Sequence, residues 1–98
     1  MKRNDILETA LKCVDGSRDR VHGKPENSFD TIADLWTAYL DKPLCATDVA
    51  AMLALLKIAR IKTGDASNPG YLDNFVDLAG YAACGGELAS KYCEGDPQ

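Results

Sequence analysis

The sequence predicts an all-α fold, a four-helix bundle-like single domain, and three observations support this prediction. First, apolar residues recur at helical spacing in four segments that turn-forming residues separate. Second, the β-branched residues are scattered and no hairpin dipeptide divides two alternating runs, so no strand is expected. Third, residues 49–61 are apolar except for Lys57 and Arg60, which is typical of a buried helix. We expect this helix to be the central one.

The first two helices are expected in the N-terminal half of the chain. Asn4 or Asp5 can cap the first helix, and its apolar residues share one face: Ile6, Leu7, Ala10, Leu11 and Val14. Asn27 or Ser28 begins the second helix, which ends before Pro43. Its expected core residues are Phe29, Ile32, Ala33, Trp36 and Leu40. Another face is either a ligand stripe or the solvated side of the helix, and it carries Asp30, Asp34, Thr37 and Asp41.

Residues 47–64 are expected to form the third and most apolar helix. Thr47 can cap it, Asp48 lies in its first turn, and Gly64 is placed to end it. Its circumference is apolar almost all round, and three other short helices in a 98-residue chain leave part of it uncovered. We therefore expect self-association, most simply as a homodimer.

The fourth helix is expected from about residue 70 to residue 92. The pair Gly85-Gly86 is a weak point at which it should bend or end, and residues 94–98 should form a frayed tail. Beside the apolar face runs a second line of residues: Asp73, Asp77, Gly80, Cys84 and Glu87. A glycine in that line would let another backbone or a ligand approach closely.

Composition and charge exclude several classes of function. A chain of 98 residues, 46% hydrophobic and 27% charged, is expected to be one domain. Its formal net charge of -4 argues against broad nucleic-acid binding. The early charges exclude a signal peptide, and the third helix is too short and too charged to span a membrane, so we expect a cytoplasmic protein. The four cysteines lack zinc-type spacing and are expected to be reduced thiols.

One group of charged residues lies in the connection before the second helix. Arg18, Arg20, His22 and Lys24 form a candidate anion-facing cluster there, and the alternative is a solvated loop. His22 is the only histidine, and nothing near it marks a nucleophile for Ser-His-Asp or Cys-His catalysis.

A second group joins the third and fourth helices. Asp73 and Asp77 lie one helical turn apart and can jointly hold Mg²⁺, which keeps several waters and commonly bridges to phosphates. Lys57 and Arg60 would then bind those phosphates. The alternative is a salt-bridge network in which the two carboxylates neutralise the two cations. In both cases we expect all four residues, together with Gly80, to share one polar locus between the helices.

Four stretches of the chain resemble a family of small phage and prophage proteins of unknown function. They are RDRVHGKPENSF from Arg18, IADLWTAYL from Ile32, DVAAMLALLKIAR from Asp48 and DNFVDLAGYA from Asp73. The combination of K-x-x-R with D-x-x-x-D-L-A-G-Y is also similar, more distantly, to the all-α nucleoside triphosphate pyrophosphatases of the MazG and dimeric dUTPase type. Those enzymes are magnesium-dependent helical bundles.

The resemblance implies roles for particular residues. Asp73 and Asp77 would bind Mg²⁺, and Tyr81 would contact the base or ribose of a nucleotide. Lys57 and Arg60 would bind its phosphates, and Arg18 and His22 of the anion-facing cluster are further candidates for phosphate binding. The chain would be a nucleoside triphosphate pyrophosphohydrolase or a degenerate relative that binds a nucleotide without hydrolysing it, because its third helix lacks the acidic pair of those enzymes. The alternative from a different class is a small phage accessory protein that binds a host protein, with the charged residues purely structural.

Overall fold

The computed structural model describes residues 1–16 and 24–95, except for the side chains of residues 25–27 and 92–95. Within these ranges it contains four α-helices, one 3-10 helix and no strand, which confirms the all-α fold class. The elements in chain order are α1 (Arg3–Val14), α3 (Pro25–Leu40), α4 (Ala46–Thr63), η1 (Pro69–Leu72) and α5 (Asp73–Gly95). None of these described helices is long and apolar enough to cross a membrane.

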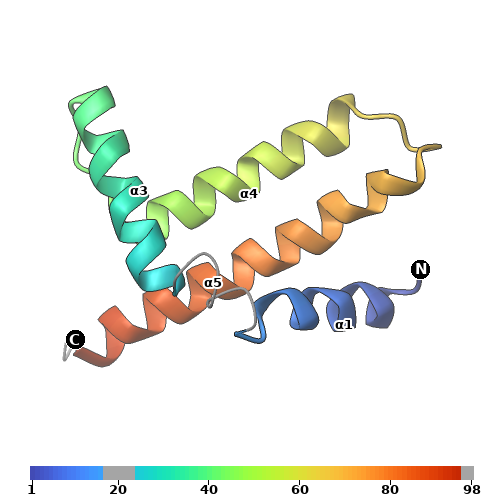
Figure 1. Ribbon diagram of the computed structural model, residues 1–98, viewed down its shortest axis with the longest axis horizontal. Helices are drawn as coiled ribbons and strands as arrows, with labels where there is room; N and C mark the ends of the chain where they lie inside the picture. Colours follow the sequence, from blue (N-terminus) through green and yellow to red (C-terminus); the bar gives the residue numbers. More distant parts are fainter. Residues whose placement is uncertain (17–23, 96–98) are drawn as a thin grey trace.

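The helix at the centre of the arrangement is α5. It lies between α1 and α4 and packs on both, while α3 packs on α4 beside its beginning (Figure 1). The helices α4 and α5 run antiparallel and form a hairpin whose turn contains η1. The expectation that the helix at residues 47–64 is central is therefore wrong, because α4 contacts other helices on one side and leaves its opposite side uncovered.

Two glycines allow α5 to be approached from two sides. A Cβ atom added at Gly85 would lie 3.1 Å from the Cβ atom of Ala50 on α4, and one added at Gly80 would lie 3.5 Å from Cγ1 of Val14 on α1. The sequence suggested that this helix would bend or end at Gly85-Gly86, but the helix does not end there and continues to Gly95. Close packing of α4 on Gly85 supplies the stabilisation that helix propensity alone lacks there.

Helix caps differ from those expected. Cys45, not Thr47, is the N-cap of α4: its backbone N–H donates to Asp48 Oδ2 at 2.9 Å, and its thiol donates to the same oxygen at 3.3 Å. The Asp5 carboxylate accepts in the same way from the backbone N–H of Lys2, which precedes α1. A carboxylate three residues into the helix thus satisfies a backbone donor at each of these N-termini.

The N-terminal end of α3 also differs from the expectation. The helix begins at Pro25 rather than at Asn27 or Ser28, because proline suits the first helical position, where its missing N–H costs nothing. At its C-terminal end the Thr37 hydroxyl oxygen accepts from the backbone N–H of Leu44 at 2.9 Å. Thr37 therefore stabilises the connection between α3 and α4, whereas Asp30, Asp34 and Asp41 on the same side of the helix are exposed.

The core of the described residues is thin. Its buried apolar residues are mostly alanines: Ala10, Ala33, Ala46, Val49, Ala50, Val76 and Leu88. Larger apolar side chains remain exposed on every described α-helix, including Leu11 on α1 and Leu55 on α4. The radius of gyration is 14.7 Å, whereas a compact chain of this length is expected to have about 13 Å. The arrangement is more open than a closed bundle.

Candidate functional site

The polar locus predicted between the third and fourth helices centres on one ion pair. Lys57 in α4 and Asp77 in α5 face each other across the hairpin, with 2.8 Å between Nζ and Oδ2. Lys57 is the buried charged residue among those described, with 8% of its surface exposed, whereas the Asp77 side chain is 33% exposed. The prediction that these two residues meet is confirmed.

The burial of Lys57 explains why Asp77 stands opposite to it. An ammonium group surrounded by apolar helices is unfavourable unless a partner balances its charge. The pair also agrees with the register of the hairpin, since Ala50, two turns before Lys57, lies against Gly85, about two turns after Asp77. This pair is one part of the salt-bridge network that the sequence offered as the alternative to a Mg²⁺ site.

The other two charged residues do not join this pair. Arg60 and Asp73 are both exposed, and neither forms an ion pair within the part of the chain that the structure describes. Gly80 is buried against Val14 of α1, so it does not line the locus between α4 and α5, contrary to expectation. Packing on two sides of α5 separates Gly80 from Asp77, although the two residues are near in sequence.

Arg60 instead lines a shallow depression at the turn end of the hairpin. Its volume is about 400 Å³, and it is lined by Arg60, Thr63, Gly64, Asp65, Asn68, Gly70, Tyr71 and Asn74. Local hydrogen bonds order this turn: Tyr71 donates its hydroxyl proton to the carbonyl oxygen of Ile61 at 2.5 Å, and Asn68 accepts from the backbone N–H of Gly70 at 2.8 Å. Arg60 is the one cationic side chain among the residues that line this depression.

Asp65 brings a negative charge to the lining of the same depression. The hydroxyl of Ser67 donates to Asp65 at 2.7 Å and its backbone N–H donates at 2.9 Å, and these bonds hold the pKa of the Asp65 carboxyl below its usual value. The last carbonyl groups of α4 add partial negative charge at the same end. An anion in the depression would be attracted by Arg60 and repelled by Asp65 and by these carbonyl groups.

Asp73 and Asp77 are the two carboxylates that the sequence proposed for Mg²⁺. Within residues 1–16 and 24–95, as far as side chains are described, no group of three or more Asp, Glu, His or Cys side chains could hold a metal ion. Asp77 uses one carboxylate oxygen for Lys57, which leaves its second oxygen and the exposed Asp73 one turn earlier. The Mg²⁺ site on these two residues stays a prediction.

The remaining candidate residues are spread over the molecule. Tyr81 is half-buried on α5. Arg18 and His22 lie outside the described residues, and Lys24 is exposed at the beginning of α3. Cys13, Cys45 and Cys84 are thiols, as expected, and the side chain of Cys93 lies outside the described residues.

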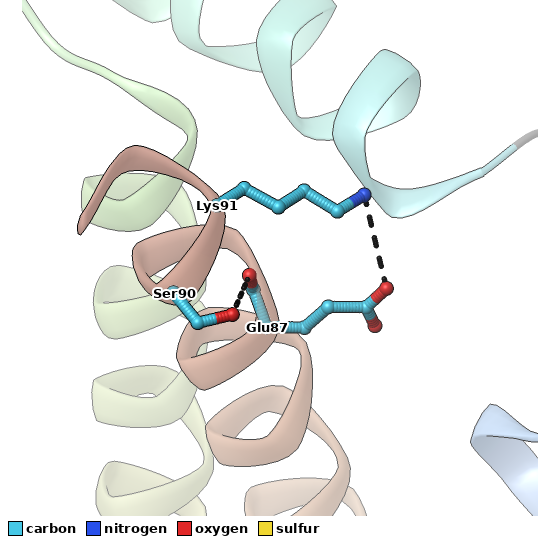
Figure 2. Close-up of polar contacts among 3 residues, drawn as sticks. All are labelled: Glu87, Ser90 and Lys91. Atoms are coloured by element: carbon cyan, nitrogen blue, oxygen red, sulfur yellow. Dashed lines mark hydrogen bonds and ion pairs between the residues drawn. The ribbon is translucent and has the colours of Figure 1, made fainter. Parts of the chain in front are cut away.

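A further charged group on α5 is an ordinary helix-surface pair. Figure 2 shows the side chains of Glu87 and Lys91 on the same side of the helix, with 3.8 Å between Lys91 Nζ and Glu87 Oε1. The Ser90 hydroxyl donates to the carbonyl oxygen of Glu87 at 2.8 Å, so it serves the helix backbone. An exposed pair at this spacing contributes about 0.3–0.5 kcal/mol and marks no binding site.

The surface that sequence reasoning could not locate is the side of α4 facing away from α5. We call it the outer stripe of α4, and it comprises Asp48, Ala51, Met52, Leu55, Ile58, Ala59 and Lys62, all of them exposed. They lie within about 60° of Leu55 on a helix of 3.6 residues per turn. Leu55 at the middle is 61% exposed. The all-round apolar pattern of residues 49–61 was the signal: it predicted an uncovered part of this helix, but it did not show which side would be uncovered.

Known proteins with similar sequences come from phages. The Gene 55 protein of Mycobacterium phage D29 is 39% identical over 94 residues, which cover 95% of this chain and 59% of the phage protein. The Gene 55 protein of Mycobacterium phage L5 is 40% identical over 78 residues, which cover 79% of this chain and 47% of the phage protein. The chain thus spans about half the length of these curated relatives. No solved structure matches it.

The family follows from a match over most of the chain. A family model described as a domain of unknown function, DUF6378, matches residues 5–89, which include all of α3 and α4 and most of α1 and α5. Together with the phage relatives, this match confirms the resemblance to phage proteins of unknown function, while the more distant likeness to nucleoside triphosphate pyrophosphatases stays a hypothesis. The chain belongs to the DUF6378 family.

Proposed function

We propose that this chain is a phage-type interaction protein, and that the outer stripe of α4 is its binding surface for another polypeptide. The observation that carries the proposal is the exposure of Met52, Leu55 and Ile58 in one row on the side of α4 that no other described helix covers. Contiguous apolar surface of this kind marks interaction sites, whereas apolar residues scattered singly need no explanation.

The polar groups support the same proposal. A catalytic site needs reactive groups that converge on one point. Here Lys57 is neutralised by Asp77 inside the hairpin, while Arg60 and Asp73 stand apart from that pair. The Lys57–Asp77 pair therefore stabilises the packing of α4 on α5. The surface of α4 that no described helix covers is instead mainly apolar.

Photo-crosslinking tests this proposal. A photo-reactive residue replaces Leu55 in one variant and Leu11 in a second, because these two leucines are similarly exposed, at 61% and 64%, on different helices. In the native host cell, illumination is expected to attach a protein at position 55 and much less at position 11. Equal yields at the two positions, or no adduct at position 55, would contradict the proposal.

A second candidate function is binding of a nucleotide or another phosphate-bearing molecule beside the hairpin turn. The specific observation in its favour is that Arg60 has no ion pair within the described residues and lines a depression with Asn74, one turn from the Lys57–Asp77 pair. Phosphate oxygens are suitable acceptors for a guanidinium group, and Mg²⁺ on Asp73 and Asp77 would neutralise further charge.

Thermal melting with added ligand tests this second candidate. Each deoxynucleoside triphosphate with Mg²⁺ is expected to raise the melting temperature of the unaltered chain, since a ligand at about 100 times its Kd adds about 2.7 kcal/mol to the free energy of unfolding. Asp77→Asn and Arg60→Ala should each lose that increase. If no triphosphate shifts the melting temperature, the charged residues serve the fold alone.

A further inference from the structure

The outer stripe of α4 has a symmetric pattern of residues about its middle. Ala51 and Ala59 lie four residues before and after Leu55, and Met52 and Ile58 lie three residues before and after it. The two ends of the stripe, seven residues from Leu55 in each direction, carry opposite charges: Asp48 is negative and Lys62 is positive. All of these residues are exposed and share one face of the helix.

From this pattern we propose that the occupant of the stripe is a second copy of this chain, with the two α4 helices antiparallel and related by a two-fold axis at Leu55. The proposal rests on the proposed function and names the partner of the same surface. In this register Leu55 meets the partner's Leu55, and Met52 meets the partner's Ile58. Asp48 meets the partner's Lys62 at both ends of the contact, which spans about 21 Å.

Size and charge favour this register over its alternatives. The two alanines flanking Leu55 let the helix axes approach, so that the larger side chains can interdigitate. A parallel pair would place Asp48 beside the partner's Asp48 and Lys62 beside the partner's Lys62, and like charges in contact are unfavourable. A two-fold contact must match a surface with itself, and the stripe meets that condition in both shape and charge.

The Asp48 carboxylate can serve the cap and the contact together. Both hydrogen bonds from Cys45 go to Oδ2. The other oxygen, Oδ1, can therefore accept from an ammonium group. Because the cap fixes the rotamer of Asp48, its charge is held at the end of the stripe before a partner arrives.

Site-specific disulfide formation tests the register. Leu55→Cys is expected to give a disulfide between two copies through position 55 under mild oxidation, since only a residue on the two-fold axis meets itself. A mixture of Ala51→Cys and Ala59→Cys should link position 51 to position 59 in preference to 51 to 51 or 59 to 59. Leu11→Cys on α1 is the matched control, and peptide mapping separates these products from bonds to the native cysteines.

Charge reversal tests the ends of the contact. Lys62→Glu is expected to raise the dissociation constant of the dimer by about 2- to 10-fold, because it disturbs two exposed ion pairs. Lys42→Glu, an exposed lysine outside α4, should leave the constant unchanged. Equal effects of the two variants would contradict the assigned pairing.

The outcomes separate this inference from the proposed function. A photo-adduct at position 55 with this same chain supports both. An adduct with a different protein, together with no disulfide through position 55 above the Leu11→Cys control, would overturn the second copy and leave the interaction surface in place. No adduct of either kind would overturn both.

Discussion

At the scale of single residues, the Lys57–Asp77 pair is the interaction that positions α4 on α5. Lys57 can keep its charge among apolar neighbours because Asp77 lies 2.8 Å away. Asp77 is partly exposed, so solvent screens the pair to some extent, and its contribution should lie between those of surface and fully buried pairs.

Removing the Asp77 charge should destabilise the chain. Asp77→Asn is expected to lower the free energy of unfolding by about 2–3 kcal/mol, because it leaves the Lys57 ammonium buried without a counter-charge. Glu87→Gln, which breaks the exposed pair with Lys91, should cost less than about 0.5 kcal/mol. Urea denaturation followed by circular dichroism measures both, and equal losses would mean that Asp77 does not balance a buried charge.

Asp48 should make stability depend on pH. The backbone N–H of Cys45 and then its thiol hold the pKa of the Asp48 carboxyl below its usual value of 3.8. A lowered pKa in the folded state means that the stabilisation is present above that value and is lost as the pH falls further. Asp48→Ala should therefore lower the melting temperature at about pH 7 and change it less at about pH 2. Asp34→Ala, on the exposed side of α3, is the control and should show no such difference.

At the scale of helices, small residues on α5 decide how closely its neighbours pack. Gly85 and Gly86 are adjacent, yet only Gly85 faces α4: an added Cβ at Gly85 would lie 3.1 Å from Ala50, whereas one at Gly86 would meet nothing within 4 Å. The two positions therefore separate the effect of helix propensity from the effect of packing.

Alanine substitutions at these two glycines should give different results. Gly86→Ala is expected to raise the free energy of unfolding by about 1 kcal/mol, because alanine favours the helix and no neighbour is disturbed. Gly85→Ala should gain less or lose stability, because its methyl group would press on the α4 helix. Equal gains in thermal or urea denaturation would show that α4 does not pack closely on Gly85.

The helices were predictable because each depends on local periodicity, and the Lys57–Asp77 pair because a buried charge needs a partner. The position of α4 was not predictable in the same way. An apolar circumference shows which sides of a helix avoid water, but it does not show whether this chain or another covers them. The continuation of α5 through Gly85-Gly86 also depends on a contact with Ala50, distant in sequence, that overrides local propensity.

At the scale of the whole molecule, the small core and the exposed apolar residues belong together. The buried apolar residues larger than alanine, among those described, are Val49, Val76 and Leu88. Burial of a leucine-sized side chain contributes about 1.5–3 kcal/mol to stability. The exposed side chains of Leu55 and Ile58 do not make this contribution in a single chain. A second copy that covers the outer stripe of α4 would bury these side chains and extend the core across the two-fold axis.

Sedimentation velocity of three chains at micromolar concentration tests the central claim most directly. The unaltered chain is expected to sediment as a dimer, at twice the 10.6 kDa mass of one chain. Leu55→Glu should abolish the dimer, because it places two like charges on the two-fold axis, and Leu11→Glu, at an equally exposed leucine of α1, should leave it intact. A monomer near 10.6 kDa for the unaltered chain, or a dimer that survives Leu55→Glu, would contradict the account.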